Sequence, residues 1–418
     1  MCKWFIYLLL IPVSTVFAVD NKPQNGLTLD QAIINVLEKN PLLKAADFEA
    51  NAAAARIRAA QLSPAFRTSI EFENFAGTGI RSGTDVLEST LSLSKVLELG
   101  DKAKIRGDLA NNKAMLLRNE QDAKRLDILA ETAKRFIHVV TDQQRLIIAK
   151  DSLALAKDTQ KVVEQRIKAG KTPNAELRRA KITLARKEIE LEHAEHELVT
   201  SRLKLVTLWG ETQATFTTAE ASLFEIAPAI PFETLEQRLE HNPDLVRFAT
   251  EKRLAAVSIQ LARSGSRSDI EIAGGLRHFN LADDTGFVLS LNIPLGSSSR
   301  AKSKVEEAEL MSLREPHVFE QRRLELYATL FEVHQEIKHA IDAVTALRET
   351  IIPQAELALQ DYEKGYKAGR YSFLELSEAQ RTLLDSRLKS VMAAADYHQY
   401  RIEIDRLTGA GLSTGVNP

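Results

Sequence analysis

The amino-acid sequence contains the same series of unlike segments twice, about 200 residues apart. IKAGKTPNAELRRA starts at Ile167, and YKAGRYSFLELSEA starts at Tyr366. Other matching segments keep the same order in both halves. Asn-Pro occurs at 40–41 and 242–243, stretches in which apolar and polar residues alternate occur at 68–75 and 268–275, and TLWG at 207–210 matches RLTG at 406–409. Chance similarity between helical stretches would not preserve this order, so the sequence predicts a duplicated fold.

Each half is predicted to contain two shorter helices, two strands, a helix of about sixty residues, a tight turn and a return helix of about thirty-five. The low content of glycine (18) and proline (12) suits long helices. Apolar residues in the longest helices recur at alternating spacings of three and four, the heptad pattern of helices packed side by side. This seam comprises Leu126, Leu129, Ala133, Phe136 and Val140, then Leu330, Val333, Ile337, Ala340, Val344, Leu347 and Ile351. A helix of this length spans on the order of 90–100 Å.

Two glycines are predicted to end these helices. Gly170 and Gly369 stand where a left-handed residue terminates a helix. Thr172 or Asn174 in the first turn, and Ser372 in the second, are candidate caps of the return helices. Each half would then end in a hairpin tip, at 168–174 and 367–373. Turn chemistry alone explains the glycines but not the shared Lys-Ala-Gly-(Lys/Arg) pattern followed by Glu-Leu.

Four segments alternate between apolar and polar residues, at about 67–75, 87–95, 269–278 and 286–295. Strands of this length cross a bilayer when tilted, and apolar-polar alternation is typical of transmembrane barrels. The residues predicted to face lipid are Ile70, Phe72, Leu91, Leu93, Ile270, Ile272, Phe287, Leu289, Leu291 and Ile293. A small water-exposed sheet packed on the helices is the alternative that the strands alone leave open.

Four strands are too few to close a barrel, which needs about eight. An open sheet edge in lipid would leave backbone groups without hydrogen bonds. The membrane interpretation therefore requires several chains to share one barrel, with eight strands from two copies or twelve from three. Only twelve strands would enclose an aqueous lumen.

The N-terminal segment 1–18 is predicted to be a signal peptide. Lys3 supplies the positive charge, an apolar run follows from Trp4 to Val13, and small residues end at Ala18. An N-terminal membrane anchor is the alternative. The single cysteine, Cys2, falls within this segment, so the mature chain is expected to have neither a disulfide nor a thiolate metal site.

Other classes of function are disfavoured. The formal net charge of −2 provides no basic field for nucleic acid. No nucleophile motif or convergent catalytic group is present, so an enzyme is not expected, and no cofactor is predicted. His193 and His196 stand three residues apart beside Glu192 and Glu195, but two histidines fall short of a metal site, and we interpret them as part of an exposed charged helix.

The ordered duplication and the two tips, GKTPNAELRRA and GRYSFLELSEA, resemble the TolC-type outer-membrane efflux factors over nearly the whole mature chain. The opening LTLDQAIINVLEKNP and the segment LELGDKAKIRG look most like the heavy-metal (CzcC-like) branch. One departure is the pair Arg178 and Arg179 in the first tip, with Ala180-Lys181 in place of Ala-Arg, which leaves partner specificity open.

The resemblance implies a homotrimer in the outer membrane of a Gram-negative bacterium. It implies long antiparallel hairpins that form an α-barrel across the periplasm, and four transmembrane strands per chain. The partners would be a periplasmic adaptor and an inner-membrane pump of the resistance–nodulation–division class. The domain plan is then a first repeat at 19–210, a linker at 211–231, a second repeat at 232–409 and a tail at 410–418.

The resemblance also assigns residues to roles. The docking and gating tips comprise Gly170, Lys171, Thr172, Glu176, Leu177, Gly369, Arg370, Tyr371, Ser372, Glu375 and Leu376. Glu164, Asp361 and Glu363 precede the tips and are candidates for a pore constriction that favours cations. The predicted function is a passive conduit that exports a metal cation, drug or other solute. The competing hypothesis is a soluble periplasmic coiled-coil adaptor or structural protein.

Overall fold

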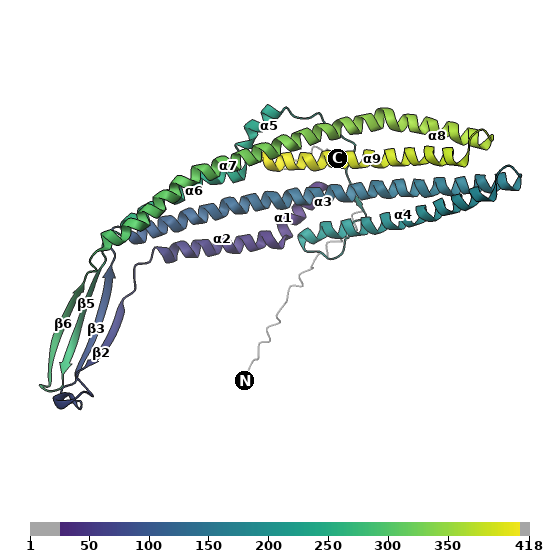
Figure 1. Ribbon diagram of the computed structural model, residues 1–418. Coiled ribbons are helices and arrows are strands. Elements are labelled where there is room, and N and C mark those ends of the chain that lie inside the picture. Colours follow the sequence, from purple (N-terminus) through teal and green to yellow (C-terminus); the bar gives the residue numbers. More distant parts are fainter. Residues whose placement is uncertain (1–25, 410–418) are drawn as a thin grey trace, which may run out of the picture.

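The computed structural model of the protein describes residues 26–409. The molecule is elongated, with a four-stranded sheet at one end and the turns of two helical hairpins at the other (Figure 1). The expected signal peptide at 1–18, with Cys2, and the tail at 410–418 lie outside the described residues. The two surfaces that the sequence singles out, the strands and the tips, are thus separated by the length of the helices.

The first repeat contains two helices, a β-hairpin and a long helical hairpin. Its longest helix has 67 residues, which corresponds to a rise of about 100 Å. The elements are α1 (Leu29–Lys39), α2 (Pro41–Ala60), β2 (Arg67–Glu73), β3 (Glu88–Leu97), α3 (Lys102–Lys168) and α4 (Asn174–Val206), with short 3-10 turns at Gly79–Arg81 and Thr207–Trp209.

The second repeat has the same order, which confirms the predicted duplication, but a π-helical turn divides its long helix. The elements are α5 (Phe232–Leu239), α6 (Pro243–Ser264), β5 (Ile270–Phe279), β6 (Asp284–Asn292), α7 (Ser297–Ala346), the π-turn (Leu347–Ile351), α8 (Ile352–Lys367) and α9 (Phe373–Leu407). Pro353 lacks an N–H for the helical ladder, which favours an interruption at this point.

The predicted heptad seam is correct only up to the π-turn. The seam is buried from Leu330 through Val344, as expected. Ile351, however, is exposed, because the extra residue in the turn rotates the following side chains, and the buried seam resumes at Ala355 and Leu359. None of the helices between residues 26 and 409 combines the length and the apolar character that a membrane crossing requires.

The two β-hairpins form one antiparallel sheet in the order β2-β3-β5-β6. β3 pairs with β5 along its whole length, from Glu88 opposite Phe279 to Leu97 opposite Ile270. The two repeats therefore meet in the middle of the sheet, and β2 and β6 form its edges.

The segment 211–231, which the sequence assigns to a linker, packs against the middle of the helices. Its strand β4 (Thr218–Ala219) pairs in parallel with β1 (Gly26–Leu27). The side-chain amide of Gln143 on α3 completes this small sheet, because its oxygen accepts from the Ala219 N–H at 2.7 Å and its nitrogen donates to the Ala219 carbonyl at 3.0 Å. Trp209, Phe216 and Leu223 are buried there in the largest apolar core.

The repeated Asn-Pro pairs fasten each second helix to the end of the return helix of the same repeat. The side-chain oxygens of Asn40 and Asn242 accept from backbone N–H groups at the starts of α2 and α6. The side-chain nitrogen of Asn40 donates to the Leu208 carbonyl at 2.6 Å, and that of Asn242 donates to the Leu407 carbonyl at 2.8 Å. The motif that first revealed the duplication is therefore structural.

Candidate functional site: the sheet faces and the hairpin tips

One face of the sheet is apolar. Ile70 lies opposite Leu91, Leu91 opposite Leu276, and Leu276 opposite Phe287, and directly opposed residues share a face. Of the predicted set, this face holds Ile70, Phe72, Leu91, Leu93, Ile270, Ile272, Phe287, Leu289 and Leu291, while Ile293 directly follows β6. Leu276, which the sequence analysis missed, extends the face across β5. Phe287 is 94% exposed and Leu289 81% exposed, so the apolar surface is uncovered in the isolated chain.

The other face is polar and is tied together across three strands by Arg277. Its guanidinium contacts Glu73 on β2 at 2.8 Å and Glu88 on β3 at 3.0 Å, and its Nε donates to the Thr90 hydroxyl at 2.8 Å. The sequence analysis missed Arg277, although extending the alternation beyond Glu271 places it on the polar face. The sheet thus separates an apolar from a charged surface.

The sheet is open. β2 and β6 each pair with one neighbour, so their outer edges present unpaired backbone groups. A four-stranded sheet cannot close on itself. Edges of this kind are sealed by strands from another chain when the sheet lies in an apolar medium.

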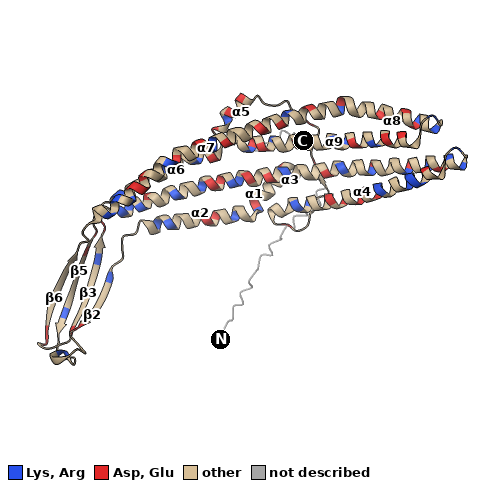
Figure 2. Ribbon diagram, in the orientation of Figure 1, with Lys and Arg blue, Asp and Glu red and all other residues tan. Residues whose placement is uncertain are grey.

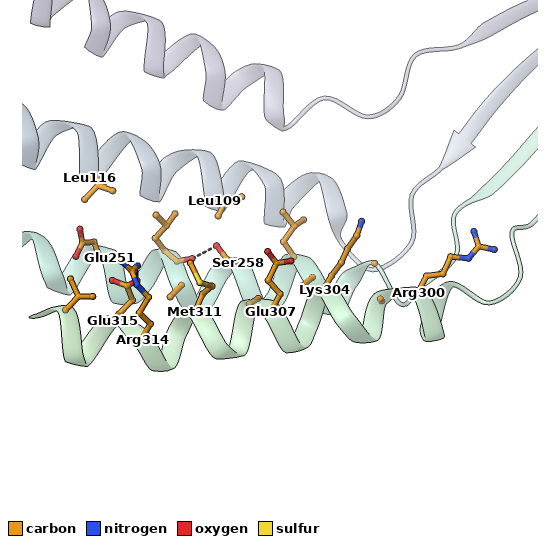
Figure 3. A pocket seen from close by; sticks show the side chains of 18 of the residues that line it. Leu109, Leu116, Glu251, Ser258, Arg300, Lys304, Glu307, Met311, Arg314 and Glu315 are labelled. Atoms are coloured by element: carbon orange, nitrogen blue, oxygen red, sulfur yellow. Dashed lines mark hydrogen bonds and ion pairs between the residues drawn. The ribbon is translucent and has the colours of Figure 1, made fainter.

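A groove of 1030 Å³ runs between α3, α6 and α7, close to the sheet (Figure 3). Leu109 and Leu116 line it from α3, and Met311 lines it from α7. Ser258, in the middle of the labelled residues, donates to the Leu254 carbonyl of its own helix at 2.8 Å. The groove therefore has apolar walls with charged residues along its length, and it brings together no catalytic arrangement among its lining residues.

The two hairpin turns have the same backbone geometry. Gly170 and Gly369 have φ angles of 71° and 80°, the left-handed conformation that glycine adopts without strain. In each turn, the backbone N–H of the residue after the glycine donates to a carbonyl of the preceding helix. The Lys171 N–H donates to the Arg166 carbonyl at 2.9 Å, and the Arg370 N–H donates to the Gly365 carbonyl at 2.8 Å. This is the pattern of a Schellman helix end.

The caps of the return helices differ. Ser372 caps α9 as expected, and it forms a capping box with Glu375. In the first tip the expectation of a Thr172 or Asn174 cap is wrong, because Pro173 occupies the N-cap position and no side chain caps the helix. The Thr172 hydroxyl instead donates to the Glu176 carboxylate at 2.8 Å.

A hydrogen-bonded clasp joins the two hairpins of one chain behind the tips. The hydroxyl of Tyr366 on α8 donates to Glu176 on α4 at 2.8 Å. The guanidinium of Arg166 on α3 lies 4.4 Å from the Tyr366 ring centre and donates to the Tyr366 carbonyl. Burial and the adjacent Glu176 carboxylate raise the pKa of Tyr366 to about 12, so its hydroxyl remains a donor at physiological pH.

The sequence analysis missed Arg166, Tyr366 and Gly365. A Cβ at Gly365 would lie 2.2 Å from the Tyr371 ring, so glycine is needed for Tyr371 to fold back on α8. A glycine inside the helical segment KGYKAG is the sequence signal that a close approach occurs here.

The predicted tip residues fall into three groups, of which the first is the half-buried pair Thr172 and Glu176, joined by a hydrogen bond. Gly170, Lys171, Gly369, Arg370, Tyr371, Ser372 and Glu375 are exposed. Leu376 is 3% exposed and belongs to a core beneath the tips, and Leu177 packs against that core. These two leucines support the exposed residues from behind.

The three candidate constriction acids lie on α3 and α8, within about two turns of the tip glycines. Asp361 is exposed, whereas Glu164 and Glu363 are half-buried, and Glu164 accepts from Gln160 at 2.8 Å. His193 and His196 are exposed on α4. Within residues 26–409, no group of three or more His, Cys, Asp or Glu side chains is placed to hold a metal ion.

A sheet with one apolar and one polar face, continued by helices about 100 Å long, defines a subunit of a membrane channel with a helical extension. The chain belongs to the outer membrane efflux protein family, whose model matches residues 32–211 and again residues 234–410. The two matches correspond to the two structural repeats. The protein is accordingly an outer-membrane efflux channel of a Gram-negative bacterium that extends into the periplasm, and a transport conduit rather than an enzyme.

Relatives of known name are similar over most of their length. The cobalt-zinc-cadmium resistance protein CzcC of Cupriavidus metallidurans is 26% identical over 323 residues, 77% of each chain. The pyoverdine export outer membrane protein OpmQ of Pseudomonas putida is 21% identical over 350 residues, 80% of this chain and 73% of that protein. TolC-family channels are trimeric and work with adaptor and pump partners.

Solved structures share the fold. CusC superposes with a TM-score of 0.75 at 18% identity and covers 92% of both chains. The open state of the MtrE outer membrane channel of Neisseria gonorrhoeae gives a TM-score of 0.71 at 17% identity, with 93% of this chain and 91% of that chain covered. The expected fold class is thereby confirmed, and the soluble adaptor hypothesis finds no support.

Proposed function

We propose that three copies of the chain form one passive export conduit through the outer membrane. The observation that carries this proposal is the open sheet, whose apolar face is exposed and whose edge strands β2 and β6 each lack a second partner. Pairing β6 of one copy with β2 of the next closes a barrel of twelve strands, wide enough for water. The apolar residues from Ile70 to Ile293 then face lipid, and the Arg277 face lines the lumen.

The tips form the periplasmic mouth and the docking surface of an adaptor, which connects the channel to an inner-membrane pump of the resistance–nodulation–division class. Four of their exposed residues are polar or charged, namely Lys171, Arg370, Ser372 and Glu375, and Lys171 and Arg370 occupy the same place in the two turns. The clasp through Tyr366 holds the two hairpins of a chain together, and its release would let the mouth widen. Adaptor binding opens the mouth if the adaptor contacts the widened arrangement better than the closed one.

The exported substrate is proposed to be a divalent heavy-metal cation. The name of CzcC, a cobalt-zinc-cadmium resistance protein, supports this class. The carboxylates of Glu164, Asp361 and Glu363 lie close to the mouth and attract cations without holding them, as a conduit requires. A second candidate is an organic solute, which the similarity to the pyoverdine export protein OpmQ favours.

The shared barrel can be tested by disulfide cross-linking between copies. The only cysteine is Cys2, which precedes the expected mature start. We would combine Ser69→Cys on β2 with Val288→Cys, Ser290→Cys or Asn292→Cys on β6 and oxidise intact outer membranes. β2 and β6 of one chain are separated by two strands, or about 14 Å, too far for a disulfide. A ladder ending at three linked chains is expected for one register, and exclusively monomeric chains would refute the proposal. Ser69→Cys alone is the control.

The substrate class can be tested in a deletion strain exposed to cobalt, zinc, cadmium and a panel of drugs. We expect sensitivity to the metals, restored by the wild-type gene. The variant Glu164→Gln/Asp361→Asn/Glu363→Gln is expected to restore resistance less well. Sensitivity to organic compounds alone would favour the second candidate.

A further inference from the structure

Basic residues occupy alternate positions near the start of both long helices that leave the sheet. α3 starts with Lys102, Lys104 and Arg106, and the start of α7 contains Arg300, Lys302 and Lys304. Cations at a helix N-terminus oppose the helix dipole. The first turns of α3 and α7 contain no acidic residue that would offset these cations, as is also the case for α2 and α8, whereas those of α1, α4, α5, α6 and α9 each contain one. The unfavourable placement occurs in both repeats, at the boundary between sheet and helices.

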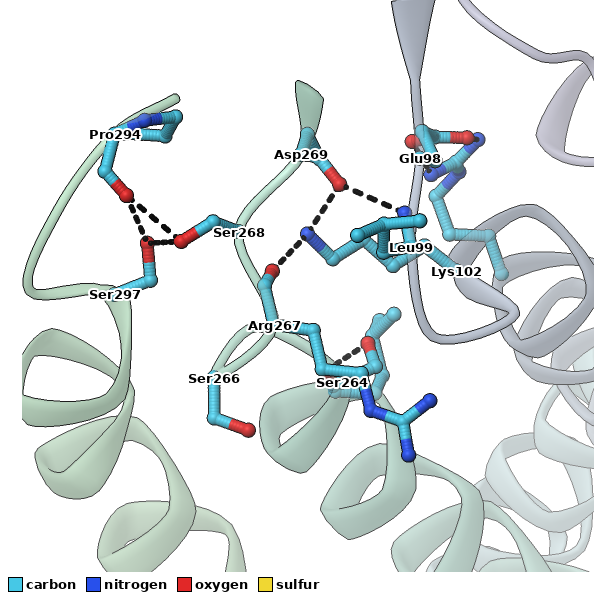
Figure 4. A network of polar contacts seen from close by, with 12 residues as sticks. Glu98, Leu99, Lys102, Ser264, Ser266, Arg267, Ser268, Asp269, Pro294 and Ser297 are labelled. Carbon is cyan, nitrogen blue, oxygen red and sulfur yellow. Dashed lines mark hydrogen bonds and ion pairs between the residues drawn. The ribbon is translucent and has the colours of Figure 1, made fainter.

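Some of these basic residues form contacts within the chain that join the helices to the segments beside the sheet. Lys102 donates to the Asp269 carboxylate at 2.7 Å and to the Arg267 carbonyl at 2.8 Å, which joins the start of α3 to the segment before β5 (Figure 4). Asp269 also accepts from the Leu99 N–H at 3.2 Å. Arg106 pairs with Glu98. These contacts account for Lys102 and Arg106, and Arg300 donates to the Leu295 carbonyl at 3.0 Å but forms no ion pair within residues 26–409.

Seven further cations at the boundary are exposed, and within residues 26–409 none of them forms an ion pair. We call them the basic collar: Arg56, Arg58, Lys104, Arg267, Arg300, Lys302 and Lys304. They come from α2, α3, α7 and the segment between α6 and β5, and basic residues are visible where these helices approach the sheet (Figure 2). The Arg267 side chain passes over Gly100, and its guanidinium extends away from the polar network in Figure 4.

No comparable cluster of cations occurs at the opposite end of the sheet. The loop between β5 and β6 contains Asp283 and no basic residue, β6 begins with Asp284, and the loop between β2 and β3 contains one residue of each sign, Arg81 and Asp85. At the collar end, Lys95 stands on the apolar face, directly opposite Ile272, with its ammonium 4.6 Å from the Phe66 ring centre. A lysine at the margin of an apolar face keeps its charge at the membrane–water interface. The collar therefore lies at the level where the apolar face ends.

We propose that the basic collar binds the phosphates of phospholipids in the periplasmic leaflet of the outer membrane. This inference rests on the proposed function, because it requires the apolar face to be embedded in lipid. The polar headgroup region on each side of a bilayer is about 5–8 Å thick. Lys304, near the start of α7, lies about 10 Å along the helix, so its side chain reaches this region. Anionic headgroups offset the repulsion between these cations and the two helix dipoles.

The test uses the purified full chain in a neutral detergent. Binding of phosphatidylglycerol and of phosphatidylcholine is measured by native mass spectrometry for the wild type and for Arg300→Gln/Lys302→Gln/Lys304→Gln. A basic residue near an anionic surface contributes about fivefold in affinity, so the triple variant should bind phosphatidylglycerol on the order of 100-fold more weakly. Binding of phosphatidylcholine should change much less. In 0.5 M salt the difference between the wild type and the triple variant should shrink, because the Debye screening length falls to about 4 Å.

The matched control is Lys150→Gln/Lys157→Gln/Lys389→Gln, which removes three exposed lysines that lie far from the sheet and form no ion pair within residues 26–409. It should bind phosphatidylglycerol as the wild type does. Arg300→Lys/Lys302→Arg/Lys304→Arg, which keeps the charge, should retain binding. If the triple variant does not assemble, Lys104→Gln/Arg267→Gln gives the same comparison at the start of α3 and in the segment between α6 and β5.

Equal affinity of the wild type and the collar variants for phosphatidylglycerol would overturn the inference, and so would an equal loss in the matched control. Displacement of the lipid by inorganic phosphate at the same concentration would identify a free anion rather than a leaflet as the ligand. Failure of the proposed function has a different result, since the wild-type chain itself would then leave the membrane fraction without detergent.

Discussion

The hydroxyl of Tyr366, at the end of α8 in the second repeat, donates a 2.8 Å hydrogen bond to Glu176, at the start of α4 in the first repeat. Together with the contacts of Arg166 to Tyr366, this bond joins the two hairpins of one chain close to their tips. The pKa of Tyr366 is raised to about 12, so its neutral form is favoured in the folded chain. The corresponding stabilisation is complete below pH 10 and is lost as the pH rises through about 12.

Tyr366→Phe is expected to loosen the tips. The change removes one hydrogen bond to a charged group, worth about 1.5–3 kcal/mol, but leaves the ring beneath Arg166. Single-channel conductance in planar bilayers should rise, because the two hairpins separate more readily. Tyr362→Phe is the matched control, since the Tyr362 hydroxyl has no hydrogen-bond partner in the described part of the chain. Unchanged conductance in Tyr366→Phe would show that the clasp does not restrict the mouth.

Asn242→Ala is expected to destabilise the second repeat by about 2–3 kcal/mol, from the lost helix cap and from the buried Leu407 carbonyl left without its donor. Asn242 is 0% exposed, so water cannot replace either bond. Asn242→Asp separates the two contributions, because it keeps the capping oxygen and removes the donor. In thermal melts followed by circular dichroism, the wild type should have the highest melting temperature, Asn242→Asp an intermediate one and Asn242→Ala the lowest. Equal melting temperatures for all three would contradict the assignment.

The two faces of β6 are expected to respond differently to the same charge. Leu289→Arg puts a cation on the apolar face and should reduce insertion into the outer membrane, since a charge at mid-bilayer costs about 2–4 kcal/mol. Ser290→Arg places the same residue on the polar face and should insert normally. The measurement is the amount of each variant in the outer-membrane fraction. Equal amounts would mean that the apolar face does not contact lipid.

Asp405 on α9 predicts a specific pH dependence. Burial raises the pKa of Asp405 to about 6, although Arg401 and Arg238 act in the opposite direction. Because the raised pKa means that the fold disfavours the charged form, stability should fall as the pH rises from about 4 to about 6. Asp405→Asn should remove this slope and stabilise the chain at pH 7 by on the order of 1–3 kcal/mol. Urea unfolding at pH 4 and pH 7 checks both, and a slope that persists in Asp405→Asn would exclude this residue as its source.

The repeated segments predicted the duplication, and the 3.6- and 2-residue periods predicted which side chains share a face. The strands alone left a water-exposed sheet open, and the barrel architecture was predicted from the family resemblance. Ile70, Leu91 and Phe287 could be assigned to one face without coordinates. The clasp could not be predicted, since Arg166, Glu176 and Tyr366 come from three helices and their approach depends on how the hairpins pack. The π-turn was also missed, as Pro353 signals an interruption but not its register.

Arg277 is expected to set the charge of the polar face. Arg277→Met leaves the Glu73 and Glu88 carboxylates without their cation, although both remain hydrated if this face lines a water-filled lumen. Two uncompensated carboxylates per chain should shift the reversal potential of single channels toward cation selectivity, and expression should fall modestly because a bridge across three strands is lost. Arg277→Lys, which keeps the charge but not the fork of donors, should retain the wild-type selectivity. A reversal potential that does not differ between Arg277→Met and the wild type would place this face away from the ion path.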